Sequence, residues 1–439
     1  MNIFNQHTSV CALVVGLSAA PALADVSIMY PDWIAGLVEP AITAYETRTG
    51  DKVTATRLPV DGYDRRIAVD LAAGTAADVV VLDSFMVAEL AAADYLASLD
   101  EALADWDEYA QFVPALLDVS SFEGTRYALP TDTDVRMLWY NKAAFDAAGI
   151  VHPWEPQSWQ DVLDTAQRLK DAGVNYAFVL PAGTKQAEAA TMQGFYMAML
   201  GADAAEGERN RLRNWEQEKW IANSPAITAT AELYDKVYNQ LQLTDPSINY
   251  AADLGNAIRE ALATGELGIF ASGSWEWSCL FNCNGVGIPS AAERAEIVGW
   301  TPWPNSGVDG AAIGTNVSGG WGIGINGVAS DMGAATDLLT TIFGYDNFQP
   351  WVVENGRMAV RTDVAESPEY QADAYLASIS ALAANTTGRD TYPGYQVVSA
   401  LIQEMTGSIL DGVSVEDALA EYQAALIDEF GAEDVMIVE

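Results

Sequence analysis

Tryptophan and aspartate residues at the ends of predicted strands are the groups of this chain that could bind a ligand. Trp275 and Trp277 follow a strand-like run that ends in glycine and serine. An indole ring can stack on the apolar face of a sugar ring, although either tryptophan could instead belong to the core. Asp83 follows a continuous apolar strand, and its carboxylate could accept two hydroxyl hydrogen bonds or remain a solvated loop acid. These side chains are therefore candidates for ligand contacts.

Few residues of this chain suit catalysis. After residue 24 the only histidine is His152, which lies in a proline-rich loop. The sequence contains neither a Gly-x-Ser-x-Gly motif nor a His/Cys spacing typical of a metal site. A glycosidase with two catalytic carboxylates stays open, because many pairs of acids could meet on folding. The formal Gly-x-Gly-x-x-Gly at 322–327 is rejected as a dinucleotide site, because it lies inside a predicted strand with no helix after it.

Alternating strand and helix patterns would position these residues. Helical spacing separates three runs with strand patterns, at 26–30, 53–58 and 78–82. The β-α-β-α-β order predicts a parallel sheet with helices on both faces. Ligands of such sheets bind beyond the carboxyl ends of the strands, which directs attention to Trp33, Tyr63 and Asp83.

The segment 127–173 has a more specific order. Residues 137–140 predict a strand, which Asn141-Lys142 and a short helix follow. Ser158 then lies three residues before Asp161, the spacing of a capping box at the start of an amphipathic helix. Three later runs also predict strands, at 265–270, 297–303 and 321–325.

This order of motifs resembles the carbohydrate-binding, maltose-binding-protein-like family of extracellular solute receptors for ABC importers. Leu129-Pro130 and two aspartates precede the strand, Tyr140-Asn141-Lys142 ends it, and Ser158-Trp159 opens the capped helix. The resemblance implies a type II periplasmic-binding-protein fold. In this α/β fold two lobes, each a mainly parallel sheet flanked by helices, are joined by hinge crossovers. It also implies a receptor without catalysis or cofactor, which closes on its ligand and docks on a membrane permease.

The resemblance predicts how the chain divides between the lobes. We expect residues 25–133 plus 305–347 to form the N-terminal lobe. Residues 134–304 plus 348–439 would form the C-terminal lobe. The first crossover would then carry Asp134 to the hinge.

The resemblance also assigns binding roles by position. It places acidic ligands at Asp83 and Asp134, with Asp132 as a weaker neighbour, and a sugar-stacking tryptophan at Trp275. The family's Gly-rich turn and x-Pro-x-Arg motif correspond to residues 355–361, although alanine stands at 359 in place of the usual proline. Arg357 in this turn could donate paired hydrogen bonds to neighbouring sugar hydroxyls, or could be a surface arginine paired with an acid. The predicted ligand-binding residues are Trp33, Tyr63, Asp83, Asp132, Asp134, Trp275, Trp277, Gly320, Trp321 and Arg357.

The aromatic residues of this set predict a neutral di- or oligosaccharide, or a small glycoside, as ligand. A receptor of the same fold for a polyol or a polyamine is the main alternative, because a polyamine site would use the same aromatic rings and acids. Arg357 in the cleft would count against a cation. A secreted glycosidase with two carboxylates is the less favoured alternative.

The first 24 residues predict a signal peptide. They contain no charged side chain, and an apolar run leads to a small-residue site before Asp25. We therefore expect cleavage before Asp25 and a periplasmic monomer. Cys279 and Cys283 would remain after cleavage. Their spacing allows a disulfide in an oxidising compartment, and two buried free thiols are the alternative.

The charge of the chain disfavours some partners. Its 61 acidic and 21 basic residues give a net charge of −40. Nucleic acids and anionic membrane surfaces are therefore poor partners, and we expect no nucleic-acid binding. An acidic surface suits salty water, where self-repulsion is screened, and we predict a marine or halophilic source.

Overall fold

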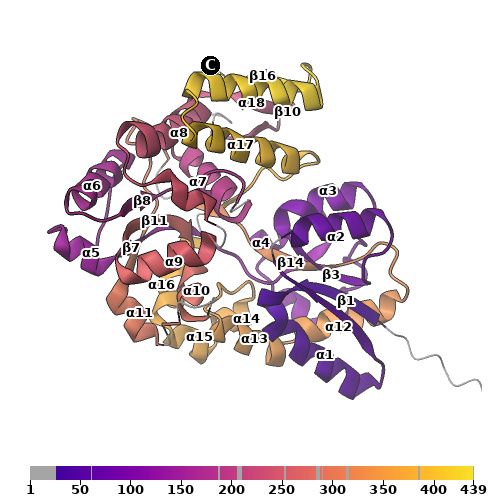
Figure 1. The fold of residues 1–439 in the computed structure, drawn as a ribbon. Helices are drawn as coiled ribbons and strands as arrows, with labels where there is room; N and C mark the ends of the chain where they lie inside the picture. The colour runs from indigo at the N-terminus through magenta and orange to yellow at the C-terminus, as the bar shows by residue number, and fades with distance from the viewer. Residues whose placement is uncertain are drawn as a thin grey trace, which may run out of the picture.

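The computed structural model describes residues 26–438, except residues 61, 186–187, 205–209, 252–253, 283–286, 289, 313–315 and 384–385. The predicted signal peptide and Cys283, and with it the predicted disulfide, lie outside the described residues. The chain folds into two lobes, each built around its own sheet (Figure 1).

The first lobe contains a five-stranded sheet. Its strands, in spatial order, are β2 (Val53–Leu58), β1 (Val26–Pro31), β3 (Val79–Asp83), β14 (Trp321–Ile325) and β6 (Ala128–Pro130). β1 pairs in parallel with β2 and β3, as the strand–helix alternation predicts. β14 runs antiparallel to both β3 and β6. β14 enters from the other lobe rather than through a βαβ unit, so the parallel direction is not imposed on it.

Helices cover the first sheet on both sides (Figure 1). They are α1 (Ala35–Thr49), α2 (Tyr63–Ala72), α3 (Val87–Ala92), α4 (Pro114–Asp118), α12 (Met332–Phe343), α13 (Tyr345–Glu354) and α14 (Thr362–Ala365). α1 ends at Gly50, whose φ of 82° requires the left-handed region that glycine adopts without strain. The capping glycine thus stops the helix where the sequence predicts.

The second lobe contains a four-stranded mixed sheet. Its strands, in spatial order, are β12 (Val298–Pro302), β7 (Arg136–Asn141), β11 (Leu267–Gly273) and β8 (Tyr176–Val179). β11 pairs in parallel with β8, but β7 is antiparallel to both β11 and β12. Strands β12, β11 and β8 therefore run in the same direction, so the sheet is mainly parallel, as expected, with β7 as the exception. β7 is reversed because it arrives directly from the first lobe rather than through a βαβ unit.

The remaining helices build the body of the second lobe. They are α5 (Lys142–Ala147), α6 (Trp159–Asp171), α7 (Gln193–Leu200), α8 (Pro225–Asp235), α9 (Leu254–Thr264), α10 (Glu276–Asn282), α11 (Ala291–Ile297), α15 (Pro368–Ala372), α16 (Ala374–Ala383), α17 (Tyr395–Leu410) and α18 (Val415–Phe430). Ser158 caps α6 by accepting a hydrogen bond from the Asp161 amide (3.2 Å). The Asp161 carboxylate accepts from the Gln157 amide rather than from Ser158, so only half of the predicted capping box forms.

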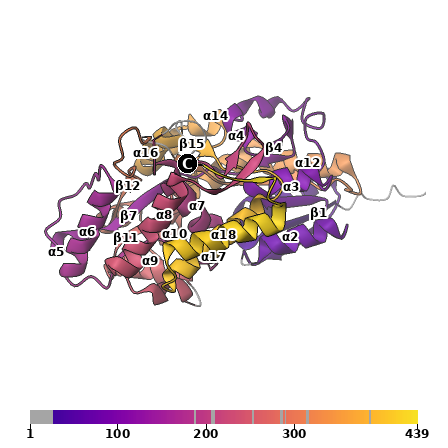
Figure 2. The ribbon, with the colours of Figure 1, turned by 90° about the horizontal axis from the view of Figure 1, so that it is seen from above.

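A small third sheet completes the second lobe beside α17 and α18, which lie along each other (Figure 2). Its strands are β16 (Val435–Ile437), β10 (Lys219–Asn223) and β9 (Arg213–Asn214). Two short pairs also form: β13 (Asn316–Ser318) with β15 (Thr386–Gly388), and β4 (Ser121–Phe122) with β5 (Thr125–Arg126).

Two crossovers lie side by side at the junction of the lobes. The Thr131 amide donates to the Trp321 carbonyl (2.8 Å), and the hydroxyls of Thr133 and Ser318 are 2.7 Å apart. Strand bridging also pairs Thr133 with Met358, which brings a third segment to the same place. Hinge residues of three segments therefore form one hydrogen-bonded unit.

Contacts near the predicted lobe boundaries do not follow them closely. α13 packs on α1 and α12, and the Val113 amide donates to the Val360 carbonyl (2.9 Å). The Trp159 amide of the second lobe donates to Asn305 (2.9 Å). These contacts favour a returning segment of the first lobe that begins after residue 305 and ends later than residue 347. The boundaries themselves stay a prediction.

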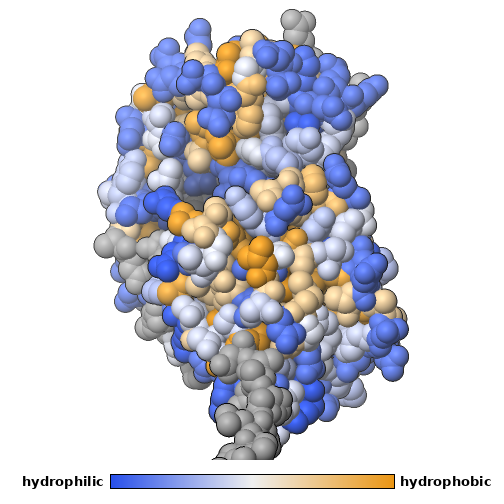
Figure 3. Space-filling model, turned by 90° about the vertical axis from the view of Figure 1, so that its right-hand side faces the viewer, coloured by the Kyte–Doolittle hydropathy of each residue, from blue (hydrophilic) through white to orange (hydrophobic). Residues whose placement is uncertain are grey.

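The face of the molecule seen in Figure 3 is mainly hydrophilic, with smaller apolar patches. A chain with 61 acidic residues is expected to present such a surface. Within the described residues, no helix combines the length and the apolar character needed to cross a membrane.

Candidate ligand site between the lobes

Three predicted site residues meet at the edge of the first sheet. Asp83 ends β3 and is in register with Trp321 at the start of β14. Trp33 follows β1, and its ring centroid lies 5.6 Å from that of Trp321 in an edge-to-face arrangement. Both tryptophans are half-buried. The strand ends therefore position an aromatic corner beside a carboxylate, as the strand order predicts.

Tyr63 lies behind this corner in the core of the first lobe. Its side chain is 1% exposed. Its hydroxyl, with a single proton, lies within hydrogen-bond distance of the carbonyls of Met29 (3.0 Å) and Val81 (2.9 Å), which links β1 to β3. Burial raises the pKa of Tyr63 well above its usual value. The structure thus gives this residue a structural role beneath Trp321 rather than an open ligand contact.

Asp83 is paired with an arginine that the sequence analysis did not select. Arg389 Nη2 lies 3.1 Å from Asp83 Oδ1 and 2.7 Å from Ser84 Oγ. Its Nη1 donates to Glu188 of the second lobe (2.7 Å). Burial, opposed by Arg389 and reinforced by Glu188, raises the pKa of Asp83 to about 6. Arg389 therefore connects a carboxylate of each lobe.

Asp64 adds a further carboxyl group at the start of α2. Burial first, and then the charges of Asp83 and Glu188, raise the pKa of this group to about 8. Asp64 is therefore mainly protonated at neutral pH, and its carboxyl group carries little charge into the junction.

Asp132 is buried on the first crossover and faces the aromatic corner. Its carboxylate accepts from Arg357 Nη1 (3.0 Å) and from the Trp321 amide (3.4 Å). The Arg357 guanidinium also lies over the Trp33 ring, 4.7 Å from its centroid. Burial raises the pKa of Asp132, and Arg357 opposes that rise. Arg357 thus lies at the predicted site, where it holds an aspartate and a tryptophan.

Asp134 pairs with Arg136 two residues later. Their charged groups are 3.3 Å apart, and Arg136 Nη2 also donates to Gln193. Arg136 is only 2% exposed. Burial lowers the pKa of Arg136 to about 10, so it stays charged at neutral pH. The hinge carboxylate predicted as a ligand contact is therefore held by a buried arginine.

Gly320 permits the two crossovers to touch. Its φ is +122°, and a Cβ at this position would lie 2.3 Å from the Asp132 carbonyl oxygen. Any other residue would therefore push the crossovers apart. The close approach explains the predicted small residue, and it places the Trp321 amide near Asp132.

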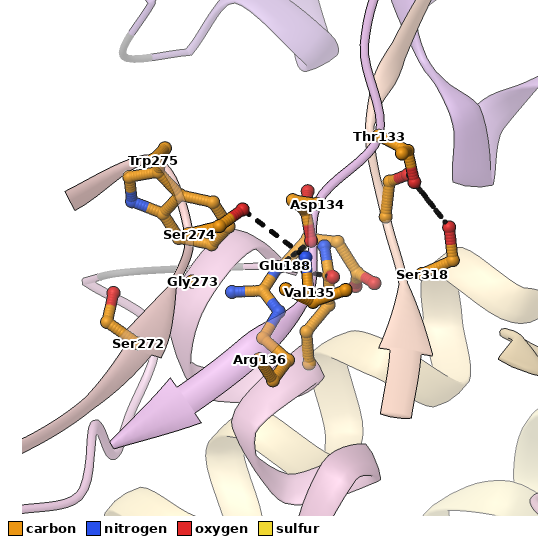
Figure 4. Close-up of polar contacts among 12 residues, drawn as sticks. Thr133, Asp134, Val135, Arg136, Glu188, Ser272, Gly273, Ser274, Trp275 and Ser318 are labelled. Atoms are coloured by element: carbon orange, nitrogen blue, oxygen red, sulfur yellow. Dashed lines mark hydrogen bonds and ion pairs between the residues drawn. The ribbon is translucent and has the colours of Figure 1, made fainter. Parts of the chain in front are cut away.

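Trp275 stands on the opposite side of the hinge, at the end of β11 (Figure 4). Its ring is half-buried. The indole Nε1 donates to Glu276 (2.9 Å), and the Arg136 guanidinium lies 4.1 Å from the ring centroid. Trp275 thus has a fixed orientation and a partly open surface, the two requirements of a stacking platform.

Trp277 belongs to the core of the second lobe. It is 5% exposed and stacks on Tyr375, with ring centroids 4.7 Å apart. Cys279 is also nearly buried in α10. Of the two adjacent tryptophans, the structure brings only Trp275 to the junction of the lobes.

Comparison with known proteins agrees with this architecture. Residues 30–347, more than half of the chain, match the family described as bacterial extracellular solute-binding protein. The chain belongs to this family. A protein of Brucella abortus (strain 2308), named only as a candidate binding protein, is 23% identical over 385 residues, 84% of each chain.

Solved structures share the fold of this solute-binding protein at low identity. An ABC transporter solute-binding protein of Thermotoga lettingae, described as bound to α-D-tagatose, is 23% identical with a TM-score of 0.78. That match covers 92% of this chain and 99% of the other. Maltose-bound MalE3 of T. maritima is 21% identical with a TM-score of 0.75, over 92% and 100% of the chains. The two-lobed α/β fold predicted from the sequence is thereby confirmed.

Sequence reasoning missed several residues of this solute-binding protein's junction, namely Asp64, Arg136, Glu188 and Arg389. Arg136 carried a signal, because it directly precedes the buried run 137–140 in a chain with only 21 basic residues. Arg389 carried none, since its partner Asp83 lies 306 positions away. The described residues contain no cluster of three or more acidic, His or Cys side chains arranged to hold a metal.

Proposed function

We propose that this solute-binding protein captures a neutral di- or oligosaccharide, or a small glycoside, between its lobes and delivers it to an ABC importer. The importer's membrane permease would be its protein partner. By this proposal the protein is a monomeric receptor of the periplasm and catalyses no reaction.

The pairing of the candidate carboxylates carries the proposal. Asp83 is paired with Arg389, Asp132 with Arg357 and Asp134 with Arg136. The charge of each carboxylate is thus already balanced inside the protein. A cationic ligand would gain little from such pairs, whereas sugar hydroxyls could still hydrogen-bond to the carboxylate and guanidinium groups.

The half-buried tryptophans support the same ligand class. Trp33 and Trp321 come from the first lobe, and Trp275 comes from the second. An apolar sugar face that stacks on these rings loses water, while its hydroxyls point towards the polar groups around them. A ligand that contacts both lobes would stabilise the closed arrangement over an open one.

The relatives give further support by analogy. Structures of similar fold are described as bound to α-D-tagatose and to maltose. A shorter match, 36% identical over 80 residues, is to the sn-glycerol-3-phosphate-binding periplasmic protein UgpB of Escherichia coli (strain K12). That match covers 18% of each chain, so we retain glycerol 3-phosphate as a ligand to test.

A thermal-shift screen tests the proposal. The panel contains maltose, trehalose, sucrose and cellobiose as sugars, sorbitol as a polyol, putrescine and spermidine as cations, and sn-glycerol 3-phosphate as an anion. We expect at least one sugar to raise Tm, with the Kd then measured by calorimetry. Stabilisation by the polyamines alone would overturn the neutral-ligand assignment. Sugar cleavage during incubation would instead indicate a glycosidase.

A further inference from the structure

Arg136 and Trp275 come together through strand pairing. Arg136 begins β7, and its register partner across the antiparallel pair is Gly273 of β11. Cross-strand partners project side chains on the same face of a sheet. Since Gly273 has no side chain, the space above it is free for another group.

The indole of Trp275 fills that space. A Cβ on Gly273 would lie 2.0 Å from Trp275 Cζ3, so the ring lies directly over this glycine. There it meets Arg136, whose guanidinium carbon is 4.1 Å from the ring centroid. Figure 4 shows the two side chains adjacent, with Asp134 and Glu188 beyond the guanidinium. One face of the indole is thereby occupied by a cation.

The surroundings hold both groups in place. Glu276 accepts from Trp275 Nε1 (2.9 Å) and is itself held by Ser272 (2.8 Å) and Arg259 (2.7 Å). Arg136 is held by Gln193 and Asp134. Its Nε and Nη1 are buried and donate to no acceptor among the described residues. A ligand ring that stacks on Trp275 must therefore use the other face.

We infer that Arg136 is a specificity-determining residue, whose charge behind Trp275 selects uncharged rings and excludes cationic ones from the platform. The inference rests on the proposed sugar site and explains how that site would reject an ammonium group. A cation attracts the negative face of an indole, but here one cation already uses the ring.

The size of the effect follows from distance. An ammonium group stacked about 4 Å above the free face would lie about 8 Å from the Arg136 charge. At an effective dielectric constant of about 20, that repulsion would weaken the binding of the ammonium group roughly thirtyfold. Two carboxylates offset part of this repulsion. Asp134 pairs with Arg136 (3.3 Å). Glu276, itself paired with Arg259 (2.7 Å), accepts from Trp275 Nε1 (2.9 Å). We therefore expect a discrimination of about tenfold.

The test compares ligands that carry a charged or an uncharged substituent at the same ring position, and the R136Q and R136K variants separate the effect of charge from that of size. The probes are the sugar that binds best in the screen and its aminodeoxy analogue, measured by calorimetry at pH 6, where the amine is protonated. We expect the wild-type protein to bind the amino sugar about tenfold more weakly than its N-acetylated form. R136Q should remove most of that difference, whereas R136K, which keeps the charge, should retain it.

Each outcome decides the inference. Equal affinities of the wild-type protein for the charged and acetylated sugars would overturn it, with no variant required. An unchanged ratio in folded R136Q would also overturn it, and the thermal transition of each variant shows whether it is folded. If no sugar binds the wild-type protein, the proposed function fails instead, which is visible before any variant is made.

Discussion

Two sites on opposite sides of the hinge each combine a tryptophan, an arginine over its ring and an aspartate paired with that arginine. The two arginines differ in how deeply they are buried. In the first lobe Arg357 lies over Trp33 and pairs with Asp132. In the second lobe Arg136 lies over Trp275 and pairs with Asp134. The Arg357 side chain is 16% exposed, whereas that of Arg136 is 3% exposed.

This difference in burial distinguishes an arginine that can contact the ligand from one that only supports a tryptophan. An arginine that retains exposure can turn towards a ligand and donate hydrogen bonds to hydroxyl groups. A buried arginine cannot move without leaving its charge unpaired in a poorly solvated place. We therefore expect Arg357 to touch the ligand and Arg136 to act through Trp275.

The largest expected effects come from the two adjacent tryptophans. Trp277→Ala should lower the free energy of unfolding by about 3–5 kcal/mol, because it leaves a cavity in the core beside Tyr375. Trp275→Ala should lower the free energy of unfolding less, because its ring is only half-buried, but should weaken sugar binding by about thirtyfold or more. Urea unfolding measures the stability of both variants, and calorimetry measures their sugar affinity. Undiminished affinity of Trp275→Ala would remove this residue from the site.

The two ion pairs should differ in what their loss costs. Asp134→Asn leaves Arg136 buried and unpaired, and should destabilise the protein by about 3 kcal/mol. Asp132→Asn should cost about 1 kcal/mol, because Arg357 can reach solvent. Equal losses in urea unfolding would show that burial does not distinguish the two sites. Sugar affinity should change more in Asp132→Asn, since its arginine is the expected ligand contact.

Two buried carboxyl groups of the first lobe, Asp83 at the end of β3 and Asp64 at the start of α2, make a pH prediction. Asp83 and Asp64, with pKa values raised to about 6 and about 8, bind protons more readily folded than unfolded. Their contribution to stability therefore grows as the pH falls through these folded values, and it stops growing below about 4, the usual pKa of an aspartate. Asp64→Asn should raise Tm strongly at pH 8.5 and much less at pH 5. A Tm gain of the same size at both pH values would contradict the assignment.

Added salt should have the smallest effect of these changes. It should change the stability of the protein through its exposed surface charges rather than through the two tryptophan sites. A net charge of −40 repels itself, and NaCl screens exposed charges more than buried pairs. We expect Tm to rise by several degrees between low salt and about 1 M NaCl, with little change in sugar affinity. A Tm independent of salt would argue against a marine or halophilic source.

Much of this architecture was readable from local patterns. Alternating runs predicted β1, β2 and β3, and the strand-end rule brought Trp33 and Asp83 to one sheet edge. The same rule selected Tyr63, which the structure buries, because a position after a strand does not state which way the side chain points. Local reasoning also failed for β7, whose antiparallel pairing follows from the route of the chain between lobes.

The sequence by itself determined the elements, the acidic surface and the residue types available for binding, because these depend on neighbours a few positions apart. Only the tertiary structure decided which charges are balanced. Arg389 meets Asp83 and Arg357 meets Asp132 across 306 and 225 positions of sequence. Arg136 reaches Trp275 only because Gly273 leaves room across the strand pair. Partners so distant are chosen by the packing of two lobes, which no local pattern encodes.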